Sequence, residues 1–265
     1  MRVTPEEIVG RADLNYAEAQ RDFTRRAGGV VLDEGGVLCF AGGHPMPVLV
    51  NGVMRIDPRV PADEVLDRAR RFFRAHRRGF SVLARGRADA DLDAVAEAAG
   101  MVGMGDPPGM VLHARLPDPV PPAGVTVRRV VTMADVAAFA QVQAEAYATY
   151  GMPLDVAPAL FARLETAVAP HIVAFLALDG ETPVAGALTI VTHGVSGVYW
   201  VGTVPAARRR GLAALVTTLA GNAGFDLGAQ VGALQASVMG EPVYRGLGWV
   251  EVTRYPYRAQ FAPPA

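Results

Sequence analysis

The sequence predicts a chain of mixed α+β and α/β class in two domains, each a mixed, mostly antiparallel sheet flanked by helices. Two observations support this prediction. Strand-like and helix-like stretches alternate in a similar order in both halves of the 265 residues. Between the halves, residues 116–124 hold four prolines and one glycine, a composition typical of a linker. We therefore expect a first domain over 1–118, a linker over 119–124 and a second domain over 125–265.

Composition restricts the classes of function. Hydrophobic residues make up 51% of the chain, enough for a substantial core, and the formal net charge is -1. This balance gives no reason to propose nucleic acid or an anionic membrane as a partner. The chain has no lysine, a bias that codon usage explains more simply than function. Cys39 is the single cysteine and lies in an apolar, strand-like run, so an intramolecular disulfide is excluded.

Targeting and metal-binding patterns are not found in the sequence. The first residues lack the apolar core of a signal peptide, and no uncharged run approaches the ~20 residues needed to span a bilayer. The five histidines are scattered, with no His/Cys pair at the spacing of metal ligands. We therefore expect a soluble protein of a reducing compartment, the cytoplasm, with no metal site.

The second half reads as ten elements. Thr132 and Asp135 have the spacing of a capping box, which satisfies two backbone N–H groups at the start of a helix. In chain order we expect a strand at 125–131, a helix from 132, a helix at 156–167, strands at 171–178, 183–192 and 198–204, a helix from 211, a strand at 229–239, a short helix, and a last strand from 249.

The first half echoes this order. Its clearest helix has acids near its start and arginines near its end, as the helix dipole favours. In chain order we expect a strand pair at 29–40, a strand at 47–56, a helix at 63–77, a strand at 79–84, a helix at 91–99 and a strand at 110–116.

The most informative stretch is 198–213, where an apolar strand passes through three arginines into a helix. A glycine at such a junction, here Gly211, leaves backbone N–H groups unpaired beside the positive end of the helix dipole. This arrangement predicts a binding site for an anion such as a pyrophosphate. An ordinary turn with solvated arginines is the alternative. The apolar face of the helix recurs at Leu212, Leu215, Val216 and Leu219.

Arg208-x-x-Gly211-x-Ala213 resembles the Q/R-x-x-G-x-G/A signature of the GNAT-type N-acetyltransferases, which bind acetyl-CoA. The resemblance implies that Gly211 lets the backbone approach a phosphate and that Ala213 keeps the next position small. In that family the preceding strand carries a bulge and separates from its neighbour, and its free edge pairs with the pantetheine arm. The cofactor-binding residues implied here are Val201, Gly202, Thr203, Val204, Arg208, Arg209, Arg210, Gly211, Leu212 and Ala213, with a backbone N–H near 201–203 as oxyanion donor.

A second match follows in the family's order. A strand ending near Ser237 precedes a short helix with Tyr244 and a turn at Trp249, which resembles the family's C-terminal signature. The resemblance, which covers about 125–261, assigns Tyr244 as general acid toward the sulfur of CoA, because a tyrosine is protonated near neutral pH. Ser237 would hydrogen-bond the pantetheine or the tyrosine. A core tyrosine packed beneath Trp249 and a serine that only ends its strand are the alternatives.

The general base and the acceptor stay open. Spacing prefers none of four candidate bases, Glu145, Asp155, His193 and Glu241. In this fold the first two helices and their junction line the acceptor site. Here that segment, 146–154, includes Tyr147, Tyr150 and Met152, which favours a partly apolar acceptor.

The resemblance implies an enzyme that transfers an acetyl group from acetyl-CoA, as cosubstrate, to the amine of a small molecule or peptide. It implies no metal, nucleic acid or membrane partner, and a monomer or homodimer. The alternative is a catalytically silent acyl-CoA-binding sensor or interaction protein that kept the same fold.

The first half resembles a degenerate copy of the same domain, as in tandem-GNAT proteins. Where the phosphate loop is expected, Asp57–Glu64 carries two prolines and three acids. Proline has no N–H to donate, and acids at a helix start repel a pyrophosphate. We therefore expect no CoA site in this half.

Overall fold

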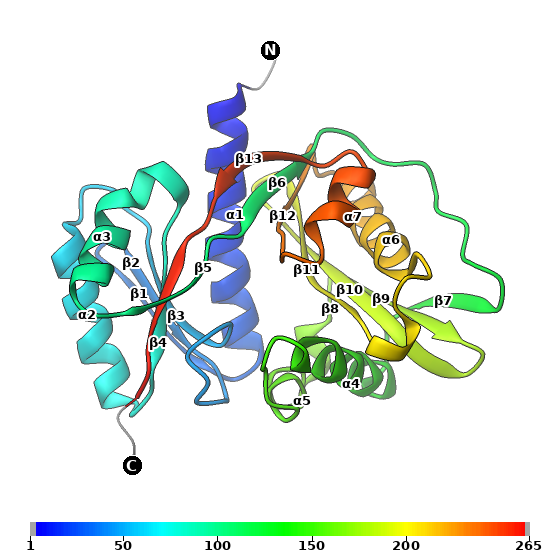
Figure 1. Ribbon diagram of the computed structural model, residues 1–265, viewed down its shortest axis with the longest axis horizontal. Coiled ribbons are helices and arrows are strands. Elements are labelled where there is room, and N and C mark those ends of the chain that lie inside the picture. Colours follow the sequence, from blue (N-terminus) through cyan, green and yellow to red (C-terminus); the bar gives the residue numbers. More distant parts are fainter. Residues whose placement is uncertain (1–3, 263–265) are drawn as a thin grey trace. The chain divides into compact units, whose positions relative to one another are not determined.

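The computed structural model describes residues 4–262 and contains two mixed β-sheets flanked by helices, which confirms the predicted fold class (Figure 1). The chain divides into two compact units. The large unit comprises the chain up to Ala19 together with Met110–Val252. The small unit comprises Gln20–Gly109 together with the chain from Thr253 onward.

The small unit holds a six-stranded sheet in the order β1-β2-β3-β4-β14-β5. Neighbouring strands are antiparallel except β3 and β4, which are parallel and are joined through α2. The elements are β1 (Val30–Glu34), β2 (Val37–Ala41), β3 (Asn51–Arg55), α2 (Ala62–Ala75), β4 (Phe80–Leu83), a 3₁₀ turn (Gly86–Asp89), α3 (Ala90–Ala98), β5 (Val102–Gly105) and β14 (Tyr257–Gln260).

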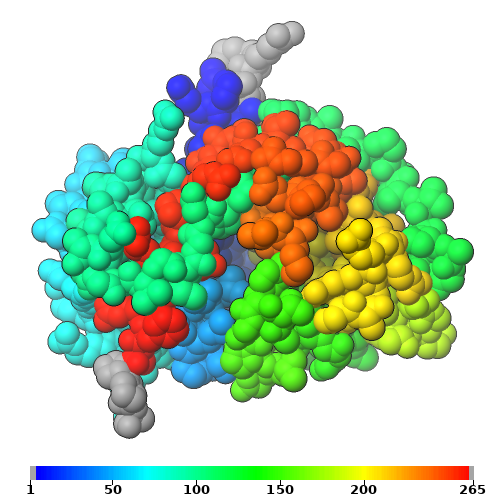
Figure 2. Space-filling model, viewed as in Figure 1, coloured from blue at the N-terminus to red at the C-terminus, as the bar shows by residue number. Residues whose placement is uncertain are grey.

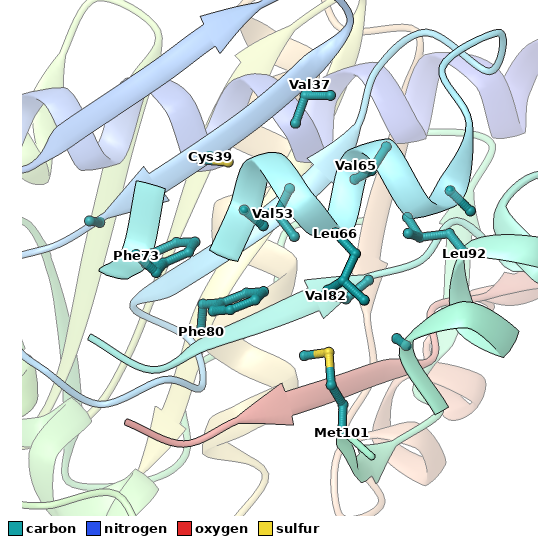
Figure 3. Close-up of a cluster of buried hydrophobic side chains, with 14 residues drawn as sticks. Val37, Cys39, Val53, Val65, Leu66, Phe73, Phe80, Val82, Leu92 and Met101 are labelled. Carbon is teal, nitrogen blue, oxygen red and sulfur yellow. The ribbon is translucent and has the colours of Figure 1, made fainter. Parts of the chain in front are cut away.

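The core of the small unit lies between α2 and the sheet (Figure 3). Apolar side chains at helical spacing place Val65 and Phe73 of α2 in one buried cluster with Val53 of the sheet. The rings of Phe73 and Phe80 stack with their centroids 4.6 Å apart. Cys39 lies in the same cluster, and burial raises the pKa of its thiol to about 12, so this cysteine stays protonated.

The large unit holds the sheet β13-β6-β12-β11-β10-β9-β7, with β8 beside β9. Helices α4 and α6 both pack on β10 and β11. The elements are β6 (Pro108–Leu112), β7 (Val125–Arg129), α4 (Met133–Ala148), α5 (Val156–Leu160), a 3₁₀ turn (Leu164–Thr166), β8 (Val168–Ala169), β9 (Ile172–Asp179), β10 (Thr182–Thr192), β11 (Val195–Thr203), a 3₁₀ turn (Pro205–Ala207), α6 (Leu212–Asp226), β12 (Val231–Gln235), α7 (Glu241–Gly246) and β13 (Val250–Arg254).

A long first helix, α1 (Pro5–Arg26), precedes these elements and was not predicted. Its buried Asn15 belongs to the large unit, where its amide donates to the carbonyl oxygen of Ile190 at 3.0 Å. The hydroxyl of Tyr199 in turn donates to Asn15 Oδ1 at 2.7 Å. The helix also packs through Ala12, which lies in a buried cluster with Val111 and Val195. Its buried apolar residues include small alanines, which give a weak periodic signal in the sequence.

Most predicted elements are present with shifted ends. The capping box of Thr132 and Asp135 at the start of α4 is formed as predicted. The helix predicted at 156–167 is shorter, because α5 ends at Leu160 and only a 3₁₀ turn follows. β5 was not predicted, and β6 begins at Pro108, before the predicted strand.

Two strands are paired far from their neighbours in the chain. β14, near the end of the sequence, lies between β4 and β5, while β6, from the first half, lies between β12 and β13. Backbone pairing therefore divides the chain at places other than the predicted domain limits. The predicted linker, 119–124, has no helix or strand. Just before it, Leu116 is held to α6 by reciprocal hydrogen bonds with the side chain of Asn222.

Candidate functional site

The strand before the predicted phosphate loop carries a bulge. β10 and β11 pair at Leu188–Tyr199 and again at Gly186–Gly202, so β11 holds one extra residue between these pairs. Trp200, within the extra segment, has a left-handed φ of 51°. A bulge of this kind kinks the strand and redirects its backbone groups. The bulge expected from the family resemblance is therefore present.

β11 also separates from its parallel neighbour. Pairing with β12 is confined to Val195–Gly197 on β11 and Val231–Ala233 on β12. From Val198 onward, β11 has no strand partner on that side among the described residues. The expected separation is therefore present, and it leaves backbone donors and acceptors available to an extended ligand.

The start of α6 presents a row of unused donors. No backbone N–H from Arg209 to Ala214 donates to another described residue. Gly211 is the N-cap, with φ 78°, and a Cβ built on it would meet nothing within 4 Å. The space in front of this residue is therefore open. Unpaired N–H groups and the positive end of a 15-residue helix together favour an anion.

The three arginines of this loop do different things. Arg208 points inward and donates to the carbonyl oxygens of Thr203, at 3.3 Å, and Ala146, at 3.2 Å, so it ties the loop to α4. Arg210 pairs with Asp179 at 2.6 Å. Arg209 is exposed and makes no hydrogen bond or ion pair among the described residues. Of the three, it is therefore the one whose guanidinium is available to a ligand.

Other predicted cofactor residues have local structural roles. A Cβ on Gly202 would lie 2.4 Å from Gln143 Oε1, so this glycine permits close packing of β11 on α4. Leu212 and Val204 are buried and anchor the two ends of the loop. Val201 and Thr203 lie at the end of β11, and Val204 follows them. Leu212 and Ala213 are the first two residues of α6.

Tyr244 lies on α7 with 6% of its surface exposed. Burial raises the pKa of its hydroxyl, as does nearby Tyr150, while the hydroxyl of Thr217 has the opposite, smaller effect. The side chain therefore stays protonated at neutral pH, as a proton donor must, while the raised pKa makes it a weaker acid than an exposed tyrosine. Its ring also lies 6.4 Å from that of Trp249, centroid to centroid, so packing against the tryptophan and proton donation are compatible.

Ser237 joins two segments that flank the separated strands. Its hydroxyl oxygen lies 3.0 Å from that of Tyr150, in the loop after α4, and it accepts from the backbone N–H of Gly240 at 3.1 Å. Figure 2 shows the same proximity, since the orange segment that holds Ser237 meets the green segment that follows α4. The structure thus brings Ser237 close to Tyr150, and Tyr150 in turn raises the pKa of Tyr244.

Three of the four candidate bases, Glu145, Glu241 and His193, have other partners or lie away from these tyrosines. Glu145 accepts from Gln141, and Glu241 pairs with Arg245. His193 occupies the β10–β11 turn, at the end of β11 opposite the bulge. No carboxylate or histidine contributes to the raised pKa of Tyr147 or Tyr244.

The described residues contain neither a metal-binding cluster nor a membrane-spanning helix. No group of three or more His, Cys, Asp or Glu side chains is placed to hold a metal ion. Among the helices of residues 4–262, none combines the length and apolarity needed to cross a membrane.

Comparison with known proteins identifies the fold. No protein-family model matches the chain, and no curated protein sequence matches it significantly. Among solved structures, a GCN5-related N-acetyltransferase from Kribbella flavida matches with a TM-score of 0.69 and 23% identity over 96% of each chain. A tandem GNAT protein from the clavulanic acid biosynthesis pathway matches with a TM-score of 0.56 and 17% identity over 100% of this chain and 98% of its own. The chain has the tandem GNAT fold.

A further GCN5-related N-acetyltransferase, from Sphaerobacter thermophilus, matches with a TM-score of 0.63 and 16% identity over 88% of this chain and 83% of its own. Within this tandem GNAT fold, sequence reasoning missed the aromatic side chain at the bulge, Trp200. Its position in the middle of the strand before the arginine loop was the available signal. The different roles of the three arginines were also missed, and they depend on contacts with Thr203 and Asp179 that no local pattern contains.

Proposed function

We propose that the large unit binds acetyl-CoA and transfers its acetyl group to an amine. The observation that carries this proposal is the row of unused N–H groups at the open start of α6, next to the unpaired edge of β11. The N–H groups from Arg209 to Ala214, with Arg209 itself, would hold the pyrophosphate. The edge of β11 from Val198 would pair with the amide-bearing arm. Acetyl-CoA supplies the acetyl thioester.

The residues of the large unit then have distinct tasks. The amine nitrogen attacks the thioester carbonyl, the carbon–sulfur bond breaks, and the amine loses a proton to water. Backbone N–H groups at the bulge, near Val201 to Thr203, would stabilise negative charge on the carbonyl oxygen. Tyr244 would give its proton to the departing thiolate. No carboxylate shifts the pKa of Tyr147 or Tyr244, so we assign no dedicated general base.

Tyr244→Phe tests the catalytic part of the proposal. The variant keeps the ring against Trp249 and removes only the hydroxyl, so CoA affinity should stay within about twofold. A positioned acid typically contributes ~10²–10⁴-fold, so kcat for acetylation should fall by that order. The measurement is acetyl transfer to a panel of amines by mass spectrometry, with CoA affinity by calorimetry. Tyr257→Phe, on β14 of the small unit, is the matched control.

Three outcomes would change the proposal. Loss of CoA affinity equal to the loss of kcat would make the hydroxyl a binding group rather than an acid. Unchanged kcat would remove Tyr244 from the chemistry. If CoA binds and no amine is acetylated, the chain is better described as an acyl-CoA-binding protein.

A further inference from the structure

One hydroxyl in the interior of α6 has no hydrogen-bond partner. Thr217 is fully buried, and its Oγ1 makes no hydrogen bond to another described residue. A threonine inside a helix commonly satisfies its hydroxyl on the carbonyl oxygen one turn earlier, and Thr217 does not. Burying a hydroxyl without a partner costs free energy, so this side chain is either a local loss of stability or is kept for another purpose.

The side of α6 that carries Thr217 faces Tyr244 and Trp249. Gly221 lies one turn further along the helix, on the same face as Thr217. A Cβ on Gly221 would lie 3.9 Å from Trp249 Cζ2, so this face contacts the tryptophan. The Tyr244 ring is 6.4 Å from the Trp249 ring, centroid to centroid, and belongs to α7, which packs against α6. Thr217 therefore lies beside Tyr244, one turn nearer to the start of α6.

The hydroxyl of Tyr244 is closely confined. A Cβ on Gly240 would lie 2.7 Å from Tyr244 Cε2 and 3.1 Å from the hydroxyl oxygen, so the ring rests directly on the backbone at the start of α7. Burial and then Tyr150 raise the pKa of this hydroxyl, whereas the Thr217 hydroxyl lowers it. The two hydroxyls complete no hydrogen bond in the structure, yet their interaction already favours the ionised form of Tyr244.

We propose that Thr217 is a positioning residue for Tyr244, whose oxygen accepts a hydrogen bond from the Thr217 hydroxyl as the tyrosine gives its proton to the thiolate of CoA. This inference rests on the proposed acetyl transfer, because it adds a residue to the acid of the same reaction. In that step the O–H bond of Tyr244 breaks, an S–H bond forms, and the electron pair stays on the tyrosine oxygen. A donor at that oxygen stabilises the charge until Tyr244 regains a proton from water.

The acidity of Tyr244 tests this without relying on turnover. Replacing Tyr244 by 3,5-difluorotyrosine makes the hydroxyl more acidic and provides a ¹⁹F signal that can be titrated by NMR in the full chain. Thr217→Val removes the neighbouring hydroxyl and keeps the branched shape, so the acid dissociation constant at position 244 should fall about 3–10-fold. Thr217→Ser keeps a hydroxyl and should stay within about 2-fold of the native chain.

Thr218→Val is the matched control. Thr218 is also buried in α6, but it points to a different side of the helix, so its substitution should leave the acidity at position 244 unchanged. Equal acid dissociation constants in the native chain and in Thr217→Val would overturn the proposal, and so would an equal fall in Thr218→Val. Thr217→Ala removes the same hydroxyl and takes the place of the valine variant if that variant does not fold.

Where acetylation is observed, kinetics gives a second measurement. Thr217→Val should lower kcat about 3–10-fold with KM for acetyl-CoA nearly unchanged, and Thr217→Ser should restore kcat. In the Tyr244→Phe background, Thr217→Val should have no further effect, because the two side chains act as a unit. A loss of kcat that is equal in both backgrounds would show that Thr217 acts on the fold and not through Tyr244.

These arms separate the two proposals. A Thr217-dependent acidity of Tyr244 in a chain that binds no CoA or acetylates no amine would refute the transfer and keep the pairing of the two hydroxyls. Acetylation that needs Tyr244 but not Thr217 would keep the transfer and refute this inference.

Discussion

The tandem GNAT fold contains the same strand–helix–strand connection twice, and the two copies end differently. In the large unit, β11 leads through an arginine loop to α6, whose first N–H groups are unused. In the small unit, β3 leads to α2, and β3 pairs with its parallel neighbour β4 only at Gly52 and Val53. Beyond Val53, one side chain connects the end of β3 to the segment that follows β4.

That side chain is Arg55, the last residue of β3. Its Nε donates to Asp89 at 2.8 Å, and its two terminal nitrogens donate to Asp91 at 2.8 and 2.6 Å. The same guanidinium donates to the carbonyl oxygens of Val60 and Ala88. Asp89 is fully buried and also accepts from Arg85. The end of β3 is therefore fastened to the segment after β4 by ion pairs.

The two helix starts differ in the groups that they offer to an anion. The N-cap of α2 is Pro61, and its first turn carries Asp63 and Glu64, whereas the N-cap of α6 is Gly211. In the small unit, Arg55 is directed inward to acidic side chains. In the large unit, Arg209 stays exposed in the loop. We propose that these differences confine CoA to the large unit.

Arg55→Met should produce the largest effect. Methionine keeps the apolar stem but leaves Asp89 as a buried charge with one partner fewer, which typically costs about 3–5 kcal/mol. Chemical denaturation should show this loss in the free energy of unfolding of the small unit. Arg59→Met is the control, because its ion pair with Asp57 is exposed, and stability should be unchanged. A fully stable Arg55→Met variant would show that the ion pairs do not fasten β3.

Gly211→Asp should produce the next largest effect. The carboxylate would lie at the backbone N–H groups that are expected to bind phosphate. The φ of 78° at position 211 is also strained for aspartate. We expect CoA affinity to fall roughly 100-fold by calorimetry. Pro61→Asp places the same residue at the N-cap of α2, where aspartate is favoured, and should leave CoA affinity and stability intact. Equal loss in both variants, or two CoA molecules bound per chain, would contradict a single site in the large unit.

Substitution of single loop arginines should have a smaller effect. Arg209→Ala removes the unpaired guanidinium and should weaken CoA binding about 3–10-fold, more at low salt than at high salt. Arg210→Ala breaks only the exposed pair with Asp179 and should change affinity less than 2-fold. The reverse ranking would assign the phosphate contact to Arg210.

The smallest effect concerns pH. Hydrogen bonds from Arg55 hold the pKa of Asp91 below its ordinary value. Because the folded state favours the ionised form, this stabilisation is present at neutral pH and is lost as the pH falls below about 4. Between pH 5 and pH 3, the free energy of unfolding should therefore decrease less in Arg55→Met than in the native chain. Parallel pH profiles would show that Asp91 gains nothing from Arg55.

Local patterns were sufficient for parts of this fold. The capping box at Thr132, the buried faces of α2 and α6, and the bulge implied by the arginine loop all depend on residues close in sequence. β5 was missed because Val102–Gly105 contains two glycines and is exposed throughout, so it shows no alternation. The contacts of Arg55 and the pairing of β14 join distant residues, and no spacing rule predicts such contacts.

For the site, the motifs indicated the right segments but not the part each side chain plays. They grouped Arg208, Arg209 and Arg210 together, whereas the structure separates a structural tie, an available cation and an ion pair. Trp200 carried no motif at all. Its left-handed φ and its contacts with rings from two other segments are seen only in the structure.

The pairing of β14 has a consequence for synthesis of the chain. Phe80 is made about 180 residues before its sheet partner, Gln260. The six-stranded sheet therefore stays unfinished, with the edges of β4 and β5 exposed, until β14 has been made. Such distant pairing slows folding, since chain closure must precede the contact. A premature stop shortly before Tyr257 would release a product that keeps the whole arginine loop and yet leaves those edges open, a ready substrate for chaperones and proteases.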